Sequence, residues 1–92
     1  MAPPALDGSI VCRLCLQVLS CLTEVLDQGQ RGFLLTEDWD RLHNALEALP
    51  LDTEQMSLAR QRLANIRRYL ADGEHGAALY ETRLLWPLVI VW

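Results

Sequence analysis

The stretch IVCRLCLQVLSCLTEVLD, residues 10–27, carries its polar residues at alternating spacings of four and three. These polar residues are Arg13, Gln17, Ser20, Glu24 and Asp27. On an α-helix this spacing gathers them into one narrow stripe and leaves most of the helix surface apolar. Because so wide an apolar face needs cover on two sides, we expect this helix to be central or to be covered partly by another molecule.

Capping and turn residues that follow this stretch divide the rest of the chain into further helices. Gly29 is well placed as the C-terminal cap of the first helix, and Thr36 is suited to the N-cap of the second. Pro50 ends the second helix, Asp52 caps the start of the third, and Gly73 ends the third. The predicted helices cover residues 10–27, 37–49, 53–72 and 74–85.

The two ends of the chain are predicted to lie outside the helices. Residues 1–8 form a leader that contains two consecutive prolines, and residues 86–92 form an apolar tail. Pro87 is expected to break the fourth helix, and the β-branched residues after it favour extended backbone. Because the loops are short, we predict one all-α domain over 1–92, with four antiparallel helices packed as helical hairpins and a hydrophobic tail.

Composition and charge exclude several classes of protein. Nineteen of the 92 residues are Leu and only 7% are aromatic, which favours helices over a β-sandwich. The net charge is −4 and no basic patch is visible, so we expect no nucleic-acid partner. No run of 18 uncharged apolar residues exists, so no membrane span is predicted. No basic residue precedes the first apolar stretch, which speaks against a signal peptide.

The cysteines invite a metal or redox interpretation. Cys12 and Cys15 have Cys-x-x-Cys spacing, but no strand precedes them, as a thioredoxin-type motif requires. A zinc site needs four ligands, and only Cys21 and His43 are at hand to complete one. We therefore predict three free, buried cysteines, no metal, no cofactor and a reducing, cytoplasmic location. A cysteine-based metal or redox protein remains the alternative.

No constellation of catalytic residues is recognisable. The chain has no Gly-rich phosphate loop and no serine in a nucleophile motif. We predict that His43 and His75 are surface residues and that the protein is not an enzyme.

Four arginines are concentrated on the third helix, at Arg60, Arg62, Arg67 and Arg68. Arg60 and Arg67 are seven residues apart and share a side, whereas Arg68 is expected to point elsewhere. Solvated helix surface is the default interpretation, and charge steering toward an acidic partner is the functional one.

The chain has more apolar side chains than one buried face of each helix would hold, and this excess predicts a protein-binding surface. We place it on a second flank of the third helix and on the tail. The expected contact residues are Leu58, Tyr69, Tyr80, Trp86, Ile90 and Trp92. Two interpretations of the tail stay open: it folds back over the first helix, or it forms a binding surface or an oligomer seam.

The third and fourth helices resemble the tetratricopeptide repeat. Tyr69, Gly73 and Ala78 keep the relative spacing of that repeat, and Pro87 is similar to its closing proline but arrives early. The Trp and Leu-Gly positions of its first helix are not matched, since Arg62 and other residues stand there. The resemblance covers about a third of the chain and implies helical-hairpin packing.

The chain also resembles small bacterial type III secretion proteins, the needle-subunit co-chaperones and the related Hrp-type proteins. The resemblance lies in Asp38-Trp39-Asp40, in the stretch 46–50 and in the Gly73 turn. It implies a groove that holds a helix of an aggregation-prone export substrate. We therefore expect a small cytoplasmic adaptor or chaperone. The alternative is a structural subunit of a homo-oligomer with the first helix in the seam.

Overall fold

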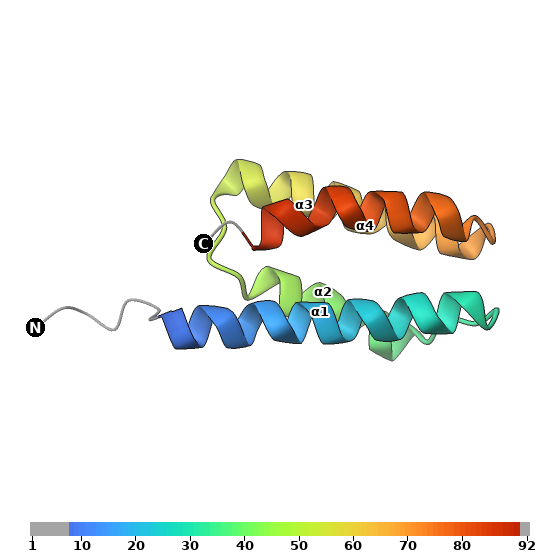
Figure 1. Ribbon diagram of the computed structural model, residues 1–92, viewed down its shortest axis with the longest axis horizontal. Coiled ribbons are helices and arrows are strands. Elements are labelled where there is room, and N and C mark those ends of the chain that lie inside the picture. Colours follow the sequence, from blue (N-terminus) through green and yellow to red (C-terminus); the bar gives the residue numbers. More distant parts are fainter. Residues whose placement is uncertain (1–7, 91–92) are drawn as a thin grey trace, which may run out of the picture.

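The computed structural model describes residues 8–90 and contains four α-helices in that range (Figure 1). They are α1 (Gly8–Gln30), α2 (Thr36–Glu47), α3 (Thr53–Ala71) and α4 (His75–Val89). Within the described residues there is no strand, which confirms the predicted all-α class. Successive helices run in opposite directions, so the chain forms two hairpins, α1–α2 and α3–α4 (Figure 1).

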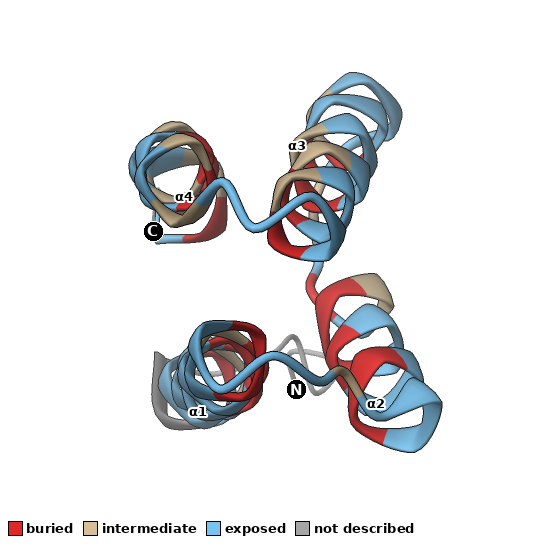
Figure 2. Ribbon diagram, turned by 90° about the vertical axis from the view of Figure 1, so that its right-hand side faces the viewer, coloured by how far each residue is buried: buried red, intermediate tan, exposed pale blue. Residues whose placement is uncertain are grey.

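The two hairpins are stacked with α4 over α1 and α3 over α2 (Figure 2). Packing is closest within each hairpin and less extensive between them. The described part of the molecule is elongated, with principal dimensions of 51 × 22 × 16 Å. Helix α1 is therefore not central: α2 covers one flank and α4 another, and the remaining flank faces outward.

One hydrophobic core joins all four helices. Its largest fully buried side chains are Leu22, Leu42, Leu46, Leu63, Ile66, Leu85, Val18, Val25 and Val89. Burial of each such side chain stabilises the fold by roughly 1.5–3 kcal/mol before the entropy of ordering is subtracted. The set draws on every helix, so the two hairpins share a single core.

The first helix continues beyond its predicted end. Gly29 lies inside α1 and is buried against Leu70, whereas Gly32, with a φ of 88°, closes the turn. Phe33 donates its N–H to the Gln28 carbonyl over 3.0 Å, and Gly32 donates to the Gly29 carbonyl over 3.1 Å. The prediction of Gly29 as a cap was wrong because the glycine is needed for the close approach of α3, not for the turn.

The start of α2 depends on a side chain from α1. Leu35 occupies the N-cap position, and its side chain makes no hydrogen bond to the helix. The prediction that Thr36 is the N-cap was therefore wrong. The buried Gln28 amide donates to the Asp38 carboxylate and accepts from the Leu35 N–H over 3.1 Å. Asp38 also pairs with Arg41 at 3.4 Å. This polar cluster satisfies the Leu35 N–H just before the helix and joins the end of α1 to the first turn of α2.

The predicted ends of α3 are confirmed to within a residue. Asp52 accepts from the Gln55 N–H over 2.7 Å, and the Gln55 side chain accepts from the Asp52 N–H over 3.4 Å. This is a complete capping box, which satisfies two otherwise unpaired helix donors. Gly73, with a φ of 74°, follows the helix as expected.

Helix α4 continues to Val89, so the prediction that it ends at residue 85 and is followed by an extended tail was wrong. Pro87 lies inside the helix and has no N–H to donate to the Arg83 carbonyl. The helix persists because Leu85 and Val89, four residues apart, share its buried face. Residues 86–89 therefore continue α4 along the bundle, Ile90 is its C-cap, and residues 91–92 lie outside the described range.

Candidate protein-binding surface

An apolar groove runs between α1 and α4, which lie one above the other in both ribbon views (Figures 1 and 2). It has a volume of about 350 Å³. The residues that line this α1–α4 groove are Leu19, Leu22, Thr82, Arg83, Trp86 and Pro87. The groove is large enough to accept an apolar side chain from another molecule.

Exposed leucines extend the apolar surface on the α1 side. Leu16 is 58% exposed and Leu19 is 40% exposed, although both belong to the wide apolar face of α1. They are three residues apart and so lie on the same side of the helix. Since α2 and α4 cover the other flanks, these side chains form the part of the apolar face that the fold leaves uncovered.

The α4 side supplies an aromatic wall and one positive charge. Trp86 is half-buried and packs against the core. Arg83 is exposed and forms no ion pair with a carboxylate in residues 8–90. The Thr82 hydroxyl donates to the Ala78 carbonyl over 2.8 Å, so it is already occupied within the helix. The groove is thus apolar, with Arg83 as the charged group at its edge.

The α1–α4 contact is fixed beside the groove by a cysteine. The Cys15 thiol donates to the Val89 carbonyl over 3.3 Å. Val89 itself is fully buried. The last turn of α4 is therefore held against the first half of α1, and the groove has a defined wall.

The structure does not gather the six predicted contact residues on one surface. Trp86 lines the α1–α4 groove, and Ile90, one helical turn further and 46% exposed, lies on the same side of α4. Tyr80 is 61% exposed but lies six residues before Trp86, which places it on a different side of α4.

The second flank of α3, predicted to bind a partner, is partly buried within the protein. Tyr69 is half-buried and packs against the core, whereas Leu58 is exposed. Between them Arg62 pairs with the buried Glu81 of α4 at 3.1 Å, so this flank faces the other helix of its hairpin. Trp92, the remaining predicted residue, lies outside the described residues.

Leu16 and Leu19 were not among the predicted contacts. The width of the apolar face on residues 10–27 was the signal that marked them, since it predicted that the helix is either central or covered partly by another molecule. The helical periodicity of the sequence did not distinguish the α1 leucines that α2 and α4 cover from those that remain exposed.

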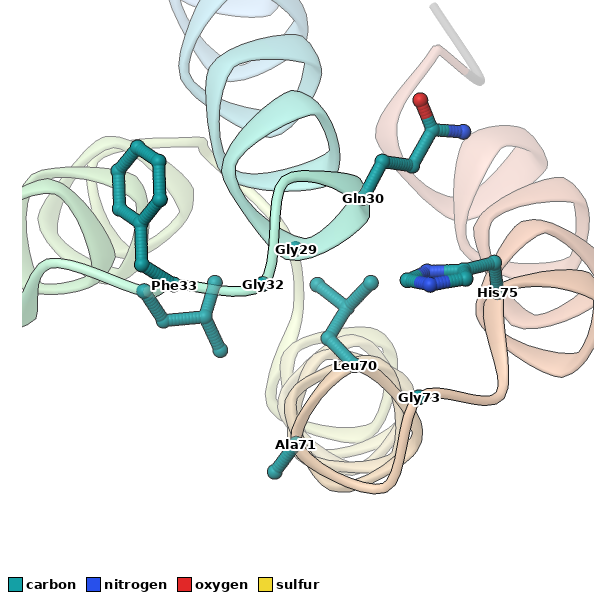
Figure 3. Close-up of a pocket in the computed structure, with 9 residues that line it drawn as sticks. Gly29, Gln30, Gly32, Phe33, Leu70, Ala71, Gly73 and His75 are labelled. Carbon is teal, nitrogen blue, oxygen red and sulfur yellow. The ribbon is translucent and has the colours of Figure 1, made fainter.

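A second cavity lies at the end of the molecule, between the α1–α2 connection and the α3–α4 turn (Figure 3). It has a volume of about 370 Å³, and Leu70 points up through it toward Gly29 (Figure 3). His75, predicted to be a surface residue, is half-buried there, and its Nδ1 atom is buried with no hydrogen-bond partner among the described residues. His43 is exposed, as expected.

The three cysteines differ in exposure. Cys21 is buried as predicted, Cys15 is half-buried, and Cys12 is exposed, so the prediction was wrong for Cys12. Burial raises the pKa of the Cys21 thiol, which keeps it protonated at neutral pH. All three are free thiols. Within residues 8–90, no three His, Cys, Asp or Glu side chains are grouped so that they could hold a metal ion.

Comparison of the chain with protein-family models, curated proteins and solved structures finds no match in any of the three. Among the helices of the described range, none combines the length and the apolar character required to cross a bilayer.

Proposed function

We propose that the protein is a non-enzymatic binding module that holds the apolar face of a partner helix in the α1–α4 groove. The observation that carries this proposal is the uncovered apolar surface made by Leu16, Leu19 and the groove wall at Trp86. A groove between two helices accepts an amphipathic helix through side chains one turn apart. An adaptor or chaperone of this kind needs no catalytic residues.

The resemblance to type III secretion co-chaperones supplies a candidate for the partner. On that basis we propose that the occupant is an aggregation-prone export substrate, held in the bacterial cytoplasm. The three free cysteines fit a reducing compartment. The arrangement of four helices in two hairpins supports this proposal, although the chain carries only part of the repeat pattern.

A fluorescently labelled amphipathic helical peptide, rich in Leu on one face, tests the proposal by anisotropy titration with the full chain. Leu16→Glu/Leu19→Glu should weaken binding by at least about tenfold, because both side chains lose apolar contact. Leu35→Glu/Leu58→Glu is a matched control, since these leucines are 52% and 42% exposed, close to 58% for Leu16 and 40% for Leu19, and do not line the groove. If the control and the double variant weaken binding equally, the groove is not the site.

A homo-oligomer with α1 in its seam is the second candidate, favoured by the same exposed leucines. Light scattering coupled to size-exclusion chromatography over a range of concentrations separates the two. A dimer that Leu16→Glu/Leu19→Glu dissociates would identify a second copy as the occupant. A monomer that binds the peptide supports the adaptor.

A further inference from the structure

A second groove lies between α2 and α3, the pair of helices on the opposite side from α1 and α4 in Figure 2. It has a volume of about 320 Å³. The residues that line this arginine groove are Trp39, His43, Arg60, Leu63, Ala64, Arg67 and Arg68. Trp39 and Leu63 are buried and form an apolar floor, whereas the arginines are exposed at the rim.

One of the three arginines is already neutralised. Glu47 of α2 accepts from Arg60 Nε over 2.5 Å and from Arg60 Nη2 over 2.6 Å. This bidentate contact lowers the pKa of the Glu47 carboxyl. His43 Nε2 lies 3.6 Å from the same carboxylate. Arg60 therefore shapes the rim but offers little unpaired charge.

The other two arginines have no carboxylate partner in residues 8–90. The Arg67 guanidinium lies over the Trp39 ring, 5.4 Å from its centroid, and the Arg68 guanidinium lies 5.2 Å from the centroid of Tyr69. Arg68, expected to point away from Arg60 and Arg67, lines the same groove.

The attraction between each guanidinium and the ring beneath it restrains the side chain without using a carboxylate. The N–H donors of arginine lie in the plane of the group, in a fork that matches a carboxylate. Because the ring already restrains the side chain, less rotamer entropy is lost when a carboxylate binds. Arg67 and Arg68 are thus held ready for acidic groups, with a buried apolar floor beside them.

The charge of this surface is opposite to that of the whole chain. Its three arginines and Glu47 leave an excess of two positive charges, in a chain whose net charge is −4. We propose that the arginine groove binds an acidic, carboxylate-rich segment of a partner protein, with carboxylates on Arg67 and Arg68 and an apolar side chain against Trp39 and Leu63. A nucleic acid is disfavoured, because only Arg67 and Arg68 are unpaired cations in the groove and binding a phosphate backbone requires a broader basic patch.

Anisotropy titration of the full chain with a labelled peptide of Glu and Asp around one Phe tests the proposal. We expect binding that weakens with salt and is lost when every acid in the peptide is replaced by its amide. Arg67→Gln/Arg68→Gln should weaken binding by at least about tenfold. Arg67→Lys/Arg68→Lys keeps the charge but not the fork, so it should restore only part of the affinity.

Arg13→Gln/Arg31→Gln is the matched control, since it removes the same charge from exposed positions on α1 and just beyond it. Circular dichroism shows whether each variant keeps its helices. Equal loss in the control would overturn the proposal, as would undiminished binding of the amide peptide. Tighter binding of a single-stranded RNA, or self-association that depends on Arg67, would overturn the choice of occupant.

The two proposals are separable. Leu16→Glu/Leu19→Glu leaves the arginine groove intact, so the acidic peptide should bind that variant as it binds the natural chain. If this double variant lost both ligands, a single surface would account for both, and the arginine groove would not be an independent site.

Discussion

Replacing Gly29 with alanine tests the close approach of α1 and α3. The added Cβ would lie 2.6 Å from Leu70 Cδ2, 3.2 Å from Cγ and 3.3 Å from Cβ. Leu70 Cδ2 can shift into the cavity that Leu70 lines, but its Cγ and Cβ also lie closer than ordinary contact, so the whole side chain must move. Overpacking of this kind costs about 1–3 kcal/mol, whereas exchanging Gly for Ala inside a helix gains roughly 0.5–1 kcal/mol. Subtracting the gain leaves a net loss of up to about 2.5 kcal/mol, with a central value of about 1 kcal/mol.

Gly76→Ala makes the same chemical change without the collision. Gly76 lies in the first turn of α4, and nothing stands within 4 Å of the position its Cβ would take. This variant should be unchanged or more stable by up to about 1 kcal/mol. In thermal unfolding monitored by circular dichroism, the melting temperature of Gly29→Ala should be about 5–10 °C below that of the natural chain. The melting temperature of Gly76→Ala should equal that of the natural chain or exceed it.

The Leu70→Ala background provides the decisive comparison, because it removes the atoms that the new methyl group would strike. There, Gly29→Ala should become neutral or stabilising, and the coupling between the two sites should be about 1–3 kcal/mol. If Gly29→Ala raised the melting temperature in the natural chain as Gly76→Ala does, the helices would not approach each other as described. The reasoning on Gly29 would then fail.

Three further predictions concern other parts of the molecule. Cys12 should react with a thiol reagent under native conditions well before Cys21; equal rates would contradict the burial of Cys21. Pro87→Ala restores an N–H inside α4 and should stabilise the protein by about 1–3 kcal/mol in urea unfolding; a loss would show that the helix needs the proline. The hydrogen bonds from Arg60 depress the pKa of the Glu47 carboxyl in the folded protein. The contribution of this carboxylate to the free energy of unfolding is therefore complete above the ordinary pKa of 4.5, and it is lost as the pH falls through the folded pKa. Unfolding followed from neutral to acidic pH should show Glu47→Gln losing less stability than the natural chain over that acidic window.

Local sequence patterns predicted the four helices. The same patterns gave wrong helix ends where contacts between helices determine where a helix stops. The N-cap at Asp52 and the helix end at Gly73 depend on neighbours within a few residues, and both predictions were confirmed. Gly29 resembles a cap in the sequence because nothing there shows that Leu70 reaches it. Likewise, Pro87 reads as a helix breaker in isolation, yet Leu85 and Val89 gain enough by burial to keep α4 helical through it.

The candidate surfaces were predictable to different degrees. The apolar width of residues 10–27 predicted that α1 is central or is covered partly by another molecule; α1 is not central, and Leu16 and Leu19 are left exposed. The individual contacts depended on how α4 packs, which the extended-tail prediction misplaced. Spacing could not have revealed the stacking of Arg67 on Trp39, because the two residues are on different helices and meet only through packing.

The division into two hairpins also bears on how fast the chain folds. Most contacts join residues close in sequence, within α1–α2 or within α3–α4, and comparatively few connect the halves. Chains dominated by such local contacts close short loops first and reach the native state in microseconds to milliseconds. We therefore expect each hairpin to form most of its own contacts before the halves meet. Docking of the halves, across the short connection at residues 48–52, is then expected to be the late step of folding and to bring Cys15 to the Val89 carbonyl.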